Sequence, residues 1–140
     1  MTAIECALSP VVAPSPDAAP FWEAADRHEL MLPYCEACRS HFFYPRTLCP
    51  ACGSRDIEWR RVSGTGQVYT FCIQHQTSVP GLRDGLPFVT ALVELDEGPR
   101  LMSFLVGVDP DPESVRCGMR VQVTFLDRAG EQTLPVFRPT

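Results

Sequence analysis

The chain has 140 residues, of which 45% are hydrophobic, a composition that suits one globular domain or a domain with a small appendage. Its formal net charge is −5, and all twelve basic residues are arginine, which disfavours a basic nucleic-acid-binding protein. No apolar run approaches the roughly 18 residues of a membrane helix, so the sequence predicts no membrane association.

Residues 1–19 contain three prolines among small side chains and show no period, so we expect a flexible lead-in there. The segment has neither the basic start nor the continuous apolar core of a signal peptide. The chain holds seven cysteines, an odd number that argues against a secreted disulfide scaffold. A reducing, cytoplasmic location is the better prediction.

A short helix is predicted from Pro20 to Leu30, because proline is tolerated at the first helical position and no breaker follows. Phe21 and Trp22 give this mostly charged segment an apolar edge. Such a short helix is marginal alone, so the two aromatic side chains must dock on a surface. That surface is either the chain's own domain or a partner protein, and we retain Phe21 and Trp22 as candidate interface residues.

Two C-x₂-C pairs follow the helix, separated by ten residues, and their members are Cys35, Cys38, Cys49 and Cys52. Each pair offers two thiolates from one tight turn, and four thiolates complete a tetrahedral site for Zn²⁺. The site has no position left for water, so we interpret the metal as structural. Iron in the same four-sulfur geometry is the alternative.

Between the two pairs, residues 41–46 resemble a strand that ends at Pro45. Phe42, Phe43 and Tyr44 are too many aromatic side chains for a small metal-held unit to bury. We therefore expect some of them to pack on the following domain or to remain open as a binding surface.

From residue 57 the pattern indicates β-structure throughout. The predicted strands are residues 57–62, 67–76, 88–95, 100–108, 119–127 and 134–137, with a turn at 63–66 and longer loops at 77–87 and 109–118. Five to six short strands with almost no helix favour a small closed barrel, because closure removes exposed edges. We predict a mainly β protein made of a lead-in (1–19), a helix with a zinc ribbon (20–56) and a five-stranded OB-fold barrel (57–140). An SH3-like barrel or a small sandwich is the alternative.

The sequence offers no catalytic constellation: no Ser/His/Asp arrangement, carboxylate pair or phosphate loop stands out. A barrel with a zinc ribbon raises the alternative of single-stranded nucleic-acid binding, but the acidic, lysine-free composition argues against it. Residues 39–61 nevertheless carry five arginines against two acids, so this part of the chain could meet an anion.

Seven motifs occur in order between residues 20 and 140. They are Phe21-Trp22-Glu23, Cys35-x₂-Cys38, Tyr44-Pro45-Arg46, Cys49-Pro50-x-Cys52-Gly53, Ser63-Gly64-x-Gly66-x-Val68-Tyr69-Thr70-Phe71, Pro87-Phe88-Val89-x-Ala91-x-Val93-Glu94-Leu95-Asp96-Glu97-Gly98 and Gly118-Met119-Arg120-Val121. In these motifs the chain resembles the DUF35 family, whose members combine a rubredoxin-like zinc ribbon with an OB-fold. The four cysteines show no departure from the family pattern.

The resemblance implies an accessory, non-catalytic subunit that works on acyl-coenzyme A esters of lipid or sterol metabolism. The implied partners are thiolase-like or aldolase-like enzymes, including complexes with MaoC-like hydratases. The resemblance also implies a contact with coenzyme A, for which Arg46 is the first candidate and Arg83 the second, each able to bind a phosphate. A plain solvated arginine is the alternative at both positions, and a stand-alone acyl-CoA-binding module is the main alternative function.

Overall fold

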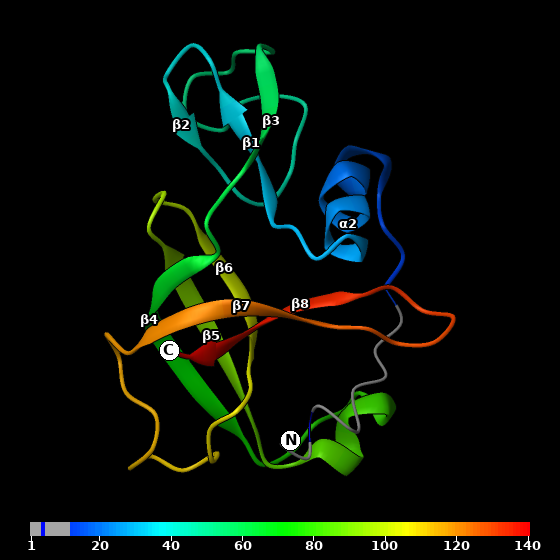
Figure 1. Cartoon of the computed structure of the whole chain (residues 1–140), viewed down its shortest axis with the longest axis vertical. Coiled ribbons are helices and arrows are strands. Elements are labelled where there is room, and N and C mark those ends of the chain that lie inside the picture. Colours follow the sequence, from blue (N-terminus) through cyan, green and yellow to red (C-terminus); the bar gives the residue numbers. More distant parts are fainter. Residues whose placement is uncertain (1–3, 5–11) are drawn as a thin grey trace.

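The computed structural model describes Ile4 and residues 12–140, so most of the predicted lead-in, residues 1–3 and 5–11, lies outside the described residues. A small three-stranded sheet stands above a barrel, and one helix lies beside the sheet (Figure 1). In chain order the elements are the 3₁₀ turn η1 (Pro16–Ala18), the helix α2 (Ala19–Asp26), the strands β1 (Met31–Cys35), β2 (Ser40–His41), β3 (Ile57–Arg61) and β4 (Thr65–Gln74), the 3₁₀ turn η2 (Pro80–Gly85), and the strands β5 (Phe88–Leu95), β6 (Arg100–Leu105), β7 (Arg120–Leu126) and β8 (Leu134–Pro139). No helix in the described part of the chain is long and apolar enough to cross a membrane.

The helix α2 is shorter than predicted, since it ends at Asp26 rather than near Leu30. Pro20 stands in its first turn, where the missing N–H would have no partner in the helix. The chain leaves the helix at His28, whose φ of 58° lies in the left-handed region and stops the helical path. The face that contains Phe21 is buried, so the helix docks on its own chain.

The ribbon sheet has the order β2-β1-β3, and both pairs are antiparallel. Two expectations are corrected here. The predicted strand 41–46 is limited to Ser40–His41, because the chain turns away before the proline at its end. The predicted strand at 57–62 forms β3 and pairs along the whole of β1, so it belongs to the ribbon and not to the barrel. A third strand gives the small sheet the support that a two-stranded hairpin lacks.

The barrel closes in the order β4-β5-β6-β8-β7, with β7 returning to β4. The pair β6 and β8 is parallel, and the other pairs are antiparallel. The predicted five-stranded OB-fold barrel and the mainly β class are thus confirmed. Gly66 in β4 is required by close approach, because a Cβ there would overlap the carbonyl oxygen of Glu94 in β5.

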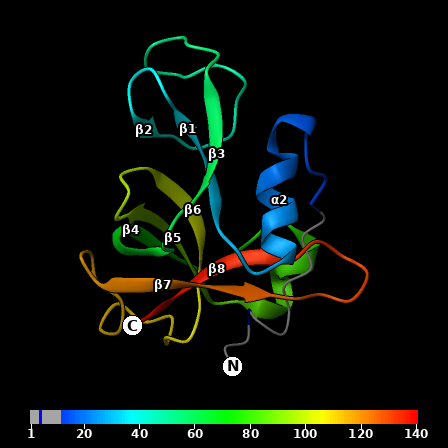
Figure 2. The ribbon, with the colours of Figure 1, turned by 45° about the horizontal axis from the view of Figure 1, so that its top comes forward.

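One hydrophobic core joins the ribbon side to the barrel. Phe21 of α2 and Leu32 of β1 belong to the same buried cluster as Val93 of β5 and Phe137 of β8. In both views the C-terminal end of α2 points toward the barrel, near the loop between β7 and β8 (Figure 2). The helix, the ribbon and the barrel are therefore fixed relative to one another by shared packing, and surfaces between them have a defined shape.

Candidate metal centre and the aromatic groove beside it

The four cysteines come from two turns of the ribbon. Cys35 ends β1 and Cys38 follows in the next turn, whereas Cys49 and Cys52 lie in a second turn before β3. In that second turn, Cys49 N–H donates to the Ser54 carbonyl at 2.9 Å. The residue after Cys52 is a glycine with φ of 76°, a conformation that favours glycine, so the chain can fold back around the sulfurs.

The four sulfur atoms are close enough to share one ion. They all lie within 4.8 Å of one another, and the Cys35–Cys52 and Cys38–Cys49 Sγ distances are both 3.6 Å. Four sulfurs at about 2.3 Å from a tetrahedral zinc are about 3.8 Å apart. The structure therefore confirms a metal-binding arrangement of the four predicted cysteines.

Two of the thiols have opposite shifts of pKa. The backbone N–H of Cys52, helped by that of Ala51, lowers the pKa of Cys49 to about 6 against the effect of burial. The backbone N–H of Ser54 acts most strongly on Cys52 and favours its thiolate, yet the Cys35 thiol, burial and the remaining thiols raise the pKa of Cys52 to about 11. Four adjacent thiolates repel one another, and a bound divalent cation offsets this repulsion so that all four can ionise.

A cluster of aromatic rings in edge-to-face and tilted contacts connects the ribbon to the helix. The centroid of the Phe21 ring lies 5.0 Å from that of Trp22 and 5.4 Å from that of Phe43. The ring centroids of Phe43 and Tyr44 are 5.1 Å apart. Phe21 is only 4% exposed, which corrects the prediction that its side chain contacts a partner. Trp22 is partly exposed, so of these two residues it is the one that remains a candidate for contact with another molecule.

Beside this cluster of rings lies a hollow of about 360 Å³, which we call the aromatic groove. Its walls are Trp22 of α2, Tyr44 of the ribbon loop, residues 101–104 of β6, and Pro135 of β8. The ribbon aromatics were expected to pack on the following domain or to stay open, and both occur: Phe43 packs against the core and Tyr44 is 42% exposed.

The barrel side of the groove was missed by sequence reasoning. Strand β6 carries Leu101 and Leu105 toward the core, yet Met102 and Phe104, on its other face, are also apolar. A strand whose outer face is exposed to water normally alternates apolar and polar residues. The apolar residues on both faces of β6 were the available signal that its outer face lines a site.

The two arginines that are candidates for a coenzyme A contact lie far from each other. Arg46 is an exposed residue of the ribbon loop, and Arg83 is an exposed residue of η2. In Figure 1, η2 lies at the end of the barrel away from the ribbon. Neither side chain has a carboxylate partner among the residues that the structure describes, so both guanidinium groups are open to an anion, but at separate places.

Polar contacts that the sequence did not reveal hold α2 against the barrel. Asp127 accepts a hydrogen bond from Thr133 Oγ1 at 3.0 Å and contacts His28 Nε2 at 2.8 Å, while the His28 ring stacks on Phe125. These contacts, above all that with His28, lower the pKa of Asp127. Both partners come from the ends of elements far apart in sequence, so no local motif indicates them.

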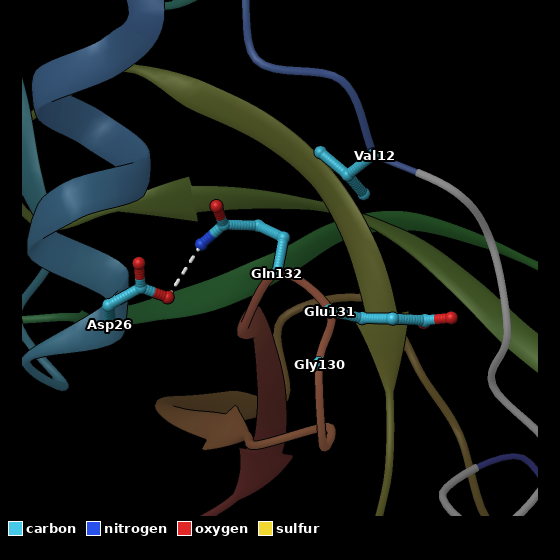
Figure 3. Close-up of a pocket in the computed structure, with 5 residues that line it drawn as sticks. All are labelled: Val12, Asp26, Gly130, Glu131 and Gln132. Atoms are coloured by element: carbon cyan, nitrogen blue, oxygen red, sulfur yellow. Dashed lines mark hydrogen bonds between the residues drawn. The ribbon is translucent and has the colours of Figure 1, made fainter.

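A second contact lies in a shallow hollow of about 400 Å³ at the end of the helix (Figure 3). There Gln132 Nε2, in the loop between β7 and β8, donates to Asp26 Oδ1 at 2.8 Å and to the Trp22 carbonyl at 3.1 Å. Because Trp22 forms one wall of the aromatic groove, these bonds help to fix the width of the groove.

Two family models match the chain one after the other: the ChsH2 rubredoxin-like zinc ribbon domain at residues 22–58, and the ChsH2 C-terminal OB-fold domain at residues 59–126. A DUF35 domain-containing scaffold protein of Methanocaldococcus jannaschii is 34% identical, over 71% of this chain and 70% of that protein. The chain belongs to the DUF35 family. The family predicted from the motifs is thus confirmed.

Two further proteins to which the chain is similar are named for enzymes. A protein of Thermomonospora curvata called "Probable enoyl-CoA hydratase alpha subunit" is 42% identical over 133 residues, which are 95% of this chain and 40% of that protein. This DUF35 chain thus spans well under half of that relative. A solved chain of the Ltp2-ChsH2(DUF35) aldolase is 41% identical with a TM-score of 0.79, and the match covers 91% of this chain and 98% of that one.

Proposed function

We propose that this DUF35 chain is an accessory, non-catalytic subunit of an acyl-CoA-processing complex whose chemistry is done by a thiolase-like or aldolase-like partner. The observation that carries the proposal is the similarity, over nearly its whole length, to a chain of the Ltp2-ChsH2(DUF35) aldolase. The hydratase subunit of Thermomonospora curvata supports an acyl-CoA substrate class, and a MaoC-like hydratase is a second candidate partner.

We further propose that the four cysteines bind structural Zn²⁺. Four thiolates fill a tetrahedral shell and leave no position for water or substrate, so the ion holds the ribbon together and takes no part in a reaction. Thiolates must stay reduced to hold an ion, which supports a cytoplasmic location. Elemental analysis of the purified chain distinguishes zinc from iron, and an iron-loaded four-sulfur site would contradict the zinc assignment.

Arg46 is the proposed contact for a coenzyme A phosphate, because it is exposed and has no carboxylate partner among the described residues. Arg83 is the second candidate, in a separate place. Replacing Arg46 with alanine should weaken binding of coenzyme A to the assembled complex, whereas Arg55→Ala, in the same ribbon, serves as the matched control. Equal affinities for the two variants would contradict the role of Arg46.

The experiment that tests the main proposal is affinity purification of the tagged chain from its native organism, followed by mass spectrometry. We expect stoichiometric recovery of one acyl-CoA enzyme. Recovery of a lone monomer that binds acyl-CoA esters would overturn the accessory-subunit proposal and favour a stand-alone binding module. Recovery of the chain together with single-stranded nucleic acid would favour a nucleic-acid-binding function.

A further inference from the structure

The aromatic groove gathers apolar side chains from α2, the ribbon loop, β6 and β8 around one hollow of about 360 Å³. Single exposed apolar residues need no explanation, whereas a contiguous apolar surface marks a place where something binds. Met102 is 73% exposed and Tyr44 is 42% exposed, so the groove is open to water in the isolated chain. An apolar occupant would remove from water a surface that folding alone leaves wet.

Among the side chains that line the groove in the described part of the chain, one hydrogen-bond donor has no acceptor. Ser103 Oγ donates to the Pro135 carbonyl at 2.8 Å, so the hydroxyl of this wall already has an acceptor. Trp22 Nε1 approaches Tyr44 Oη at 3.4 Å, and because an indole nitrogen can only donate, the tyrosine oxygen accepts. The Tyr44 O–H then has no acceptor among the described residues and can donate to an occupant of the groove.

We propose that the aromatic groove binds the acyl part of a coenzyme A ester, with the thioester carbonyl oxygen accepting a hydrogen bond from Tyr44 Oη. The apolar walls would hold the hydrocarbon, and the single donor would fix its polar end. This inference deepens the proposed function. The thioester part of the ligand rests on that proposed function, whereas the apolar part follows from the apolar walls of the groove.

The size of the groove limits the occupant. A protein cavity of about 150 Å³ holds one benzene ring. The groove, at about 360 Å³, has room for an apolar body about twice that size. Met102 forms one wall with an unbranched and adaptable side chain, so chains and fused rings of similar volume can both be accommodated.

The test uses the full metal-loaded chain and isothermal titration calorimetry. The probe is the decanoyl thioester of N-acetylcysteamine, which carries an acyl group without any nucleotide. We expect saturable one-to-one binding of this probe and no measurable binding of N-acetylcysteamine alone. Failure of the probe to bind would overturn the inference, and so would displacement of the probe by free coenzyme A, since the groove would then recognise the carrier.

Two variants locate the site. Met102→Glu places a charge in the apolar wall and should weaken binding more than tenfold, while Val79→Glu, at an exposed apolar residue elsewhere, should leave it unchanged. Tyr44→Phe removes the donor and should weaken binding about three- to tenfold. Tyr69→Phe is its control, because Tyr69 is exposed to a similar degree (47%) and does not line the groove.

The outcomes separate this inference from the proposed function. Unchanged binding in Met102→Glu would place the probe elsewhere and overturn the inference, and unchanged binding in Tyr44→Phe would overturn the carbonyl contact. If the probe does not bind but Met102→Glu prevents recovery of the partner enzyme, the groove is a protein contact. The accessory-subunit proposal would then stand while the acyl site would be wrong.

Discussion

Phe21→Ala should destabilise the whole chain, because Phe21 lies in the core shared by the helix, the ribbon and the barrel. Its side chain is 4% exposed and its ring contacts those of Trp22 and Phe43. Truncation of a buried phenylalanine to alanine costs about 3–5 kcal/mol. The total stability of a domain is about 5–15 kcal/mol, so the loss is a large fraction of what holds the fold.

The assay is equilibrium unfolding in guanidinium chloride, followed by circular dichroism and by tryptophan fluorescence. The control is Tyr69→Ala, which removes an exposed ring whose centroid lies 3.7 Å from the Arg100 guanidinium carbon. An exposed cation–π contact is worth about 0.5–1 kcal/mol, so the control should shift the midpoint only slightly. A Phe21→Ala midpoint as high as that of the control would refute the reasoning and would return Phe21 to the surface.

Three further predictions concern the metal centre and the barrel. Cys49→Ser should give poorly soluble, metal-free protein, because structural zinc contributes folding free energy directly; normal folding without metal, seen by circular dichroism and elemental analysis, would contradict a structural role. Asp96 accepts hydrogen bonds from Arg120 and Thr65, which lower its pKa from 3.8 to about 2. The ionised form therefore stabilises the fold above the ordinary pKa, this contribution is lost as the pH falls toward about 2, and Asp96→Asn should flatten the pH dependence of the unfolding midpoint over that interval. Gly66→Ala should lower stability by about 1–3 kcal/mol in chemical denaturation, because its Cβ would overlap the backbone of β5.

The metal ligands and the barrel could be predicted from the sequence because their signals are local. Spacing alone brings Cys35 to Cys38 and Cys49 to Cys52, and each barrel strand after Thr65 shows its own run of β-forming residues. The sequence places the predicted strand 57–62 in the barrel, because a strand's residues do not specify its partner. Its pairing with β1 follows from the ribbon chain returning to the first strand, a non-local event.

Only the ribbon side of the groove could be predicted from the sequence. The aromatic run ending at Tyr44 is too apolar for a small ribbon, and this excess indicates that some of its rings pack outside the ribbon or stay exposed. The barrel side of the groove forms only because β6 lies opposite the ribbon. That arrangement depends on the docking of α2 and on contacts such as that of His28 with Asp127, about a hundred residues apart. Long-range side-chain contacts of this kind have no period or spacing that a sequence displays.

The metal centre and the groove are linked by the loop that both require. Tyr44 lies between Cys38 and Cys49, so an ion bound by the four cysteines would fix both ends of the segment that carries the groove's donor. Trp22 approaches the Tyr44 hydroxyl from the helix, and Gln132 bonds the Trp22 carbonyl from the barrel. A bound metal would therefore position this loop from one side, and the contacts with α2 and the barrel position it from the other. A structural metal that takes no part in a reaction can in this way determine the geometry of a binding surface, because it reduces the conformational freedom of the loop before any ligand arrives.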